Sequence, residues 1–172
     1  LFDAAHIEDY FVKQVDVSKE LAKVDNMLEV NSVATAPQPA EIVLTYAYKD
    51  DVKVTEQKSV TLQPGSNKIS IPVEITDPHL WMPNGWGEAA LYDFEIALKV
   101  DGKIIASEKK RVGLRTIKVV LEDDKDGKAF YFVVNGQPMF AKGSNLIPDD
   151  ALLPNVTKDR YYQLIKDAKE AN

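Results

Sequence analysis

Period-two alternation of apolar and polar residues is the feature that most restricts the fold of this chain. The alternation is clearest in three segments, residues 41–49, 67–76 and 92–100. In the last of these the apolar face consists of Tyr92, Phe94, Ile96, Leu98 and Val100. This pattern predicts strands with one buried and one solvated face, as in antiparallel sheets. Asp101-Gly102, directly after the third segment, predicts a tight hairpin turn.

Seven antiparallel strands and short turns are expected in the first two thirds of the chain. Their predicted ranges are 7–17, 27–33, 41–49, 52–62, 67–76, 92–100 and 104–115. The first strand is expected to carry Ile7, Phe11, Val15 and Val17 on one side. Pro72, on the polar face of the fifth, predicts an edge strand or a bulge. Seven such strands without a helix predict an immunoglobulin-like β-sandwich over residues 1–116.

Composition and charge exclude several classes of function. The net charge is −6, and the only basic cluster, residues 109–111, is expected on the solvated face of an edge strand, so no nucleic-acid partner is predicted. No apolar run approaches the roughly 20 residues of a membrane helix, so no membrane partner is expected. The N-terminus carries no targeting pattern and begins mid-fold, which suggests an excised segment. The compartment is unknown from the sequence, with a periplasmic or secreted location favoured.

No metal or cofactor site is predicted. The chain has no cysteine, which excludes disulfides and thiolate zinc sites. His6 and His79 lack a second histidine at the spacing of metal ligands. Residues 122–127 resemble a calcium-binding loop, but Val133 stands where the bidentate glutamate is needed. We therefore expect no metal and no cofactor.

A second kind of structure is predicted after the sandwich. Asn135-Gly136 separates the apolar runs 131–134 and 138–141, which is a strong hairpin signal because both turn positions need positive φ. The second arm is expected to continue as a strand through residues 142–150. This strand would carry an amide, Asn145, and two carboxylates, Asp149 and Asp150, to the point where the chain turns away.

One amphipathic helix is expected after that strand. Thr157 is a suitable N-cap, and Asp159 suits the positive end of the helix dipole. The apolar face of the helix is formed by Tyr161, Leu164, Ile165 and Ala168. A strand followed by a helix makes one βα unit, so residues 117–172 are predicted to be a linker hairpin and the first βα unit of an incomplete (β/α)8 barrel. The predicted fold class is therefore all-β, with this unit appended.

The segment around Asp150 resembles a known enzyme family. From Val134 through Asp150 the sequence is similar to the start of the catalytic barrel in the β-mannosidase branch of glycoside hydrolase family 2. That branch has a small residue followed by Asn, Trp, Ile, Pro, any residue and Asp. The chain matches at Asn145, Ile147, Pro148 and Asp150, and differs at Leu146. The segments 80–87, 112–116 and 156–172 are also similar to family segments.

The resemblance implies a retaining exo-glycosidase that hydrolyses terminal β-mannosides of oligosaccharides. It implies two catalytic glutamates on later barrel strands, beyond Asn172, so this chain is expected to hold no catalytic residue and to be inactive alone. It also implies that the Asp150 carboxylate accepts hydrogen bonds from neighbouring sugar hydroxyls, with Asn145 beside it. The alternatives are that Asp150 caps the following turn and that Asn145 bonds the backbone. Asp149 is expected to be solvated.

Two further predictions concern the loop and the linker before the hairpin. Trp81 and Trp86 could stack against sugar, or they could close the end of the sandwich, which is the commoner use of a loop tryptophan. Arg115 is expected to pair with a carboxylate at the junction between the two domains.

Two other classes of function compete with a β-mannosidase segment. One is a β-galactosidase or β-glucuronidase of the same family, and the other is a free-standing carbohydrate-binding or adhesive sandwich. The expected partner is an oligosaccharide, bound by the full-length protein. Self-association is also predicted, because a barrel fragment cannot cover its own apolar face: the tail would pack on the sandwich or on a second copy near Phe140.

Overall fold

The computed structural model describes residues 4–49, 51 and 54–171, and its elements confirm the predicted all-β class. The chain forms two compact units, Leu1–Met139 and Phe140–Asn172, which are described here one at a time. This division groups residues 117–139 with the sandwich, whereas the predicted boundary after residue 116 stays a prediction. Asp50, which lies between the predicted strands 41–49 and 52–62, is outside the described residues, as are the predicted strand start at Val52 and Asn172.

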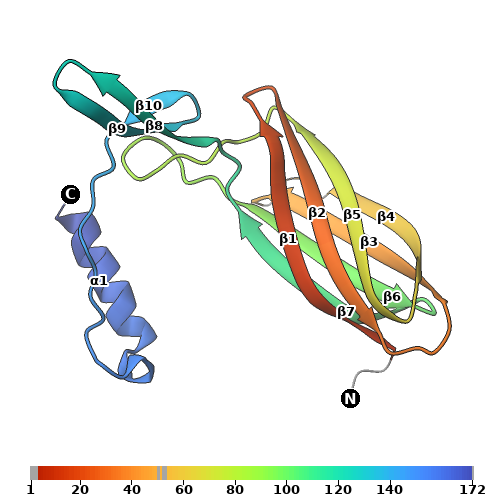
Figure 1. Ribbon diagram of the computed structural model, residues 1–172. Coiled ribbons are helices and arrows are strands. Elements are labelled where there is room, and N and C mark those ends of the chain that lie inside the picture. Colours follow the sequence, from red (N-terminus) through yellow and green to blue (C-terminus); the bar gives the residue numbers. More distant parts are fainter. Residues whose placement is uncertain (1–3, 50, 52–53, 172) are drawn as a thin grey trace. The chain divides into compact units, whose positions relative to one another are not determined.

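Seven antiparallel strands form the first part of unit 1, as predicted (Figure 1). They are β1 (Ala5–Val17), β2 (Leu21–Ser32), β3 (Gln38–Tyr48), β4 (Val54–Leu62), β5 (Gly65–Thr76), β6 (Tyr92–Val100) and β7 (Lys103–Val112). Two sheets have the orders β1-β2-β5 and β4-β3-β6-β7. Asp101 and Gly102 have φ values of 50° and 74°, which confirms the predicted turn between β6 and β7. Pro72 lies in β5 at the edge of its sheet, also as predicted.

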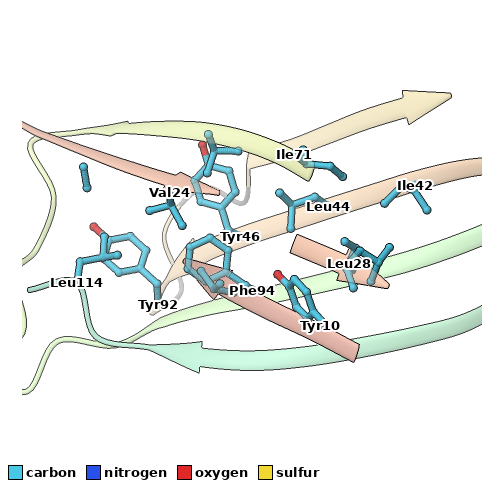
Figure 2. Close-up of a cluster of buried hydrophobic side chains, with 14 of the residues drawn as sticks. Tyr10, Val24, Leu28, Ile42, Leu44, Tyr46, Ile71, Tyr92, Phe94 and Leu114 are labelled. Atoms are coloured by element: carbon cyan, nitrogen blue, oxygen red, sulfur yellow. The ribbon is translucent and has the colours of Figure 1, made fainter. Parts of the chain in front are cut away.

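The core of the sandwich is an apolar layer between the two sheets (Figure 2). The side chains predicted to face inward from β3 and β6 are all buried, and Phe94 is 0% exposed. Its ring stacks on Tyr46 with 5.6 Å between the ring centroids. From the other sheet, Val24, Leu28 and Ile71 reach the same layer. Burial of these side chains is the main source of stability for the fold.

Of the residues predicted to form the apolar side of β1, half are buried or packed on the core and half are exposed. Val17 is buried and Ile7 packs against the core, but Phe11 and Val15 are 58% and 59% exposed. The pairing register of β1 with β2 shifts between Ile7 and Asp9 and again between Gln14 and Asp16. Each shift inserts one residue and therefore exchanges the two faces of the strand. Tyr10 and Val12 consequently take the inward positions.

Asn26 is a buried polar residue that joins both neighbours of the central strand β2. Its Oδ1 accepts a hydrogen bond from the Tyr10 hydroxyl at 2.8 Å, and its Nδ2 donates to the Ile71 carbonyl at 3.2 Å. Burial raises the pKa of Tyr10 well above its usual range. The hydroxyl therefore stays protonated and remains a donor, so the buried amide is satisfied on two sides.

The predicted Asn135-Gly136 hairpin is present in unit 1. Strands β8 (Ile117–Asp124), β9 (Gly127–Val134) and β10 (Gln137–Met139) form an antiparallel sheet in the order β10-β9-β8. Asn135 and Gly136 have φ values of 48° and 79°, as a tight turn of type I′ requires. Val134 pairs with Gln137 across this turn.

Unit 2 contains the predicted helix but not the predicted strand. Helix α1 spans Lys158–Glu170, and Thr157 caps it by accepting a hydrogen bond from the Arg160 backbone N–H at 3.2 Å. A 3-10 turn, η1 (Leu153–Asn155), precedes it, and residues 140–149 have no strand structure. A parallel strand forms only beside neighbouring strands that satisfy its backbone groups, and unit 2 has none among its described residues. None of the described helices is long and apolar enough to span a membrane.

Candidate functional site

The carboxylate of Asp150 is held by two donors from the residues that follow it. Its Oδ1 accepts from the backbone N–H of Leu152 at 2.8 Å, and its Oδ2 accepts from Asn155 Nδ2 at 3.1 Å. Both hydrogen bonds lower the pKa of Asp150 below its usual value, and the bond from Leu152 has the larger effect. The carboxylate is thus ionised at neutral pH. These two bonds are those of the turn-capping alternative.

The capping bonds leave Asp150 able to bind a ligand. An ionised carboxylate has about four lone-pair sites, of which these bonds occupy two. Asn145, the other predicted substrate-binding residue, is exposed in the irregular segment before it. Within the described part of the chain, no hydrogen bond joins Asn145 to Asp150. The two predicted residues are therefore five positions apart on one segment and are not joined by a hydrogen bond among the described residues.

Asp149 is exposed, as expected, and it also has a charged partner that the sequence did not predict. Its Oδ2 accepts a hydrogen bond from Arg160 Nε in the first turn of α1, and the two form an ion pair. The side chain of Asp149 is 31% exposed. The two adjacent carboxylates thus have separate partners, Arg160 for Asp149 and Asn155 for Asp150. The pair ties the start of α1 to the segment that carries the candidate site.

The side-chain amides of Gln14 and Asn135 bond to residues 113–116, the linker between the sandwich and strands β8–β10. We call this arrangement the amide clamp. Gln14 Oε1 accepts from the Arg115 N–H at 2.8 Å, and Gln14 Nε2 donates to the Gly113 carbonyl at 3.3 Å. On the other side, Asn135 Oδ1 accepts from the Thr116 N–H at 2.9 Å, while the Asn135 backbone N–H donates to the Thr116 carbonyl at 3.0 Å. The hairpin turn is therefore fixed to the end of the sandwich.

Asn135 also bonds the loop that contains the tryptophans. Its Nδ2 donates to the Trp81 carbonyl at 3.0 Å and lies 3.1 Å from the Met82 sulfur. The sequence identified Asn135 only as a turn residue and gave no signal for Gln14. Both residues act through partners far away along the chain, so no local pattern could have revealed them.

Arg115 stacks on an aromatic ring, which corrects its predicted pairing with a carboxylate. Its guanidinium carbon lies 4.8 Å from the centre of the Trp81 ring, and its Nη1 donates to the Gly113 carbonyl at 2.9 Å. A guanidinium over an indole is a favourable cation–π contact. Trp81 is half-buried in this packing, whereas Trp86 is 47% exposed. The packing interpretation is thus supported for Trp81.

Gly113 lies against the side chain of Trp81, and we predict that Gly113→Ala destabilises unit 1. A Cβ atom at this position would lie 2.7 Å from Trp81 Cγ, so the indole or the backbone would have to move. Such overpacking costs about 1–3 kcal/mol. Denaturant unfolding followed by tryptophan fluorescence measures the loss.

Gly143→Ala is the matched control for this substitution. A Cβ atom on Gly143 meets nothing within 4 Å, and the backbone there is not in the left-handed region. The control should therefore leave the free energy of unfolding nearly unchanged. Equal effects of the two substitutions would contradict a specific role for the Gly113–Trp81 contact.

Two of the three basic residues in the run 109–111 form ion pairs within their own sheet. Arg111 pairs with Asp93 at 2.8 Å and Lys109 with Glu95 at 3.1 Å, both across β6 and β7. Strand β7 is the edge of its sheet, as expected for this run. The described residues contain no group of three or more His, Cys, Asp or Glu side chains that could hold a metal ion.

Comparison with known proteins gives one family. The family model of glycosyl hydrolases family 2 matches residues 5–115. The β-mannosidase B of Aspergillus clavatus is 37% identical over 84% of this chain and 17% of its own length. The β-mannosidase B of Aspergillus niger is 31% identical over 96% of the chain and 20% of its own length. The chain thus spans about a fifth of the curated relatives that it matches.

Two solved structures share the fold. The β-D-mannosidase from Dictyoglomus thermophilum matches 99% of the chain and 21% of its own chain, with a TM-score of 0.92 and 28% sequence identity. The β-glucuronidase of Bacteroides uniformis matches 95% of the chain and 20% of its own, with a TM-score of 0.78 and 22% identity. The second likeness shows the fold alone.

Proposed function

Because this chain belongs to glycosyl hydrolase family 2, we propose that it is the non-catalytic sandwich segment, with the start of the catalytic barrel, of a retaining exo-β-mannosidase. The observation that carries the proposal is the similarity to two β-mannosidases B, which extends over 84% and 96% of the chain. The β-galactosidase or β-glucuronidase alternative has weaker support, since the match to the β-glucuronidase is 22% identical. The catalytic glutamates would lie outside these 172 residues.

The exposed apolar surface of unit 2 supports a barrel enzyme over a free-standing binding module. Helix α1 has no buried residue, and Tyr162 and Ile165 on it are 71% and 65% exposed. Before the helix, Phe140 and Ile147 are each 79% exposed. A soluble module gains nothing from such a surface, whereas the missing strands and helices of a barrel would cover it. Self-association through this surface is the corresponding proposal for the isolated chain.

Asp150 is the residue that we propose to bind the terminal sugar in this enzyme. Its carboxylate is ionised, is oriented by two hydrogen bonds and retains lone pairs for two neighbouring hydroxyl groups. Asn145 would contribute from the same segment. Hydrogen bonds to the sugar that strengthen in the transition state are a recognised part of glycoside hydrolysis.

An activity comparison tests the proposal. The enzyme that contains this segment should hydrolyse 4-nitrophenyl β-D-mannoside with a higher kcat/KM than the corresponding β-galactoside and β-glucuronide. The 172-residue chain alone should show no turnover above the uncatalysed rate, because a retaining glycosidase needs two carboxyl groups about 5 Å apart. Preference for the β-glucuronide, or turnover by the chain alone, would contradict the proposal.

A further inference from the structure

The side chain of Asn155 contacts the candidate site from a short 3-10 turn. Asn155 ends the 3-10 turn Leu153–Asn155, which contains Pro154, and its backbone N–H donates to the Leu152 carbonyl at 2.8 Å. The next turn of chain reaches Thr157, which caps α1. The amide is therefore carried by backbone that is fixed on both sides. From there Nδ2 donates to Asp150 Oδ2.

The two donors on Asp150 differ in kind. The donor at Leu152 is a backbone N–H, so it is present whatever the side chain of residue 152 is. The Asn155 bond is made by a side chain, so it depends on this one residue. With one donor on each oxygen, the plane of the carboxylate is fixed rather than free to rotate about the Cβ–Cγ bond. A plane that is already fixed lowers the entropic cost of binding two neighbouring hydroxyl groups together.

The surrounding charges do not replace this bond. Asp149 is adjacent in the sequence, but its charge is paired with Arg160. The pKa of Asp150 is lowered first by the Leu152 N–H and then by the Asn155 amide, against an opposing effect of burial. Among the residues that the structure describes, no charged side chain contributes to that lowering. Among the described residues, Asn155 is thus the side chain whose hydrogen bond orients this carboxylate, and the same bond adds to the lowering of its pKa.

We propose that Asn155 is a positioning residue for sugar binding, because its amide N–H fixes the Asp150 carboxylate in the orientation that accepts two sugar hydroxyls. This inference rests on the proposed function of Asp150. It assigns Asn155 a part in turnover although Asn155 itself contacts no reacting atom. The amide contributes through hydrogen-bond donation and not through its shape.

Two substitutions in the complete enzyme separate donation from shape. Asn155→Ala removes the donor, and Asn155→Asp keeps the shape but replaces the donor by a second carboxylate. Loss of orientation at a reacting centre lowers the rate by about 10- to 100-fold, so we expect kcat to fall in this range in both variants. In Asn155→Asp the two carboxylates raise each other's pKa. The acidic limb of its kcat/KM profile should therefore move to higher pH.

Thr157→Ala is the control for disturbance of the turn and the helix. It removes the N-cap of α1 without touching Asp150, so kcat should stay within twofold of the unmodified enzyme. Unchanged kcat in Asn155→Ala, or equal losses in Asn155→Ala and Thr157→Ala, would overturn the proposal. An unmoved acidic limb in Asn155→Asp would overturn it as well.

An NMR titration of the 172-residue chain tests the contact without any activity. The Asp150 carboxyl carbon should titrate below the usual aspartate range, and Asn155→Ala should raise its pKa. If Asn155→Ala leaves that pKa unchanged, the positioning contact is absent. If the pKa rises but both Asp150→Ala and Asn155→Ala leave kcat of the enzyme unchanged, the contact exists and the sugar-binding role of Asp150 is what fails.

Discussion

Replacing Phe94 by alanine is expected to lower the free energy of unfolding of the sandwich by about 3–5 kcal/mol, the usual range for a fully buried phenylalanine. Phe94 is 0% exposed and lies between Tyr46 and Tyr92, with ring centroids at 5.6 Å and 6.4 Å. Its removal leaves a cavity that two flat rings cannot fill without changing their rotamers. Domain stabilities are typically about 5–15 kcal/mol, so this loss is a large part of the whole.

Phe11→Ala is the matched control, because it removes the same side chain from the outer face. Phe11 is 58% exposed, so its loss should cost about 1 kcal/mol or less. Denaturant unfolding, followed by near-ultraviolet circular dichroism of the buried tyrosines, gives both values. Equal effects of the two substitutions would show that β1 presents the other face to the core and that the bulges are absent.

Asp150→Ala is expected to lower kcat of the complete enzyme by about 100- to 1,000-fold, the usual effect of losing one hydrogen-bonding group that stabilises a transition state. The proposed cause is the loss of an ionised acceptor for two sugar hydroxyls. The melting temperature should change little, since the turn keeps η1 and the Thr157 cap. Steady-state kinetics and a thermal melt of the same preparation separate the two effects.

Asp149→Ala provides the control for Asp150. It removes the adjacent carboxylate, which pairs with Arg160 and not with Asn155. We expect a small loss of stability and kcat within a few-fold of the unmodified enzyme. A normal kcat together with a lowered melting temperature in Asp150→Ala would instead support the capping role alone.

The sandwich was predictable because its signals are local. In β3 and β6 every second residue is apolar and the ladder between these two strands is regular, so the buried face follows from counting. The turns at Asp101-Gly102 and Asn135-Gly136 were predictable because few residues tolerate two consecutive positive φ values. The cap at Thr157 follows from the same kind of local chemistry.

The errors concern features that depend on distant partners. The buried face of β1 changes at two register shifts, and the residue types in the strand do not predict where these shifts occur. The guanidinium of Arg115 stacks on the ring of Trp81, which lies in a loop more than thirty positions away in the sequence. The strand expected before Asp150 needs neighbouring strands, and the described residues of unit 2 contain none. In each case the structure of the segment depends on its tertiary contacts and not only on the structural preference of its own residues.

The candidate site was predictable only in part. The resemblance to the β-mannosidase branch pointed to Asp150 and Asn145, because the spacing within that short motif is preserved. It did not point to Asn155, which lies in a stretch without periodicity, or to the pairing of Asp149 with Arg160. These contacts arise from the shape of the turn between residues 150 and 157, which cannot be deduced from residue types alone.

The amide clamp also has a consequence for the order of folding. The bond between Gln14 and Arg115 joins residues 101 positions apart, so it closes a loop that contains nearly the whole sandwich. Closing a loop of that length early would cost much chain entropy, and contacts of this kind form late in folding. On the ribosome, Gln14 leaves the exit tunnel long before Asn135 is synthesised. We therefore expect the sandwich to assemble first and the hairpin to bind to it last.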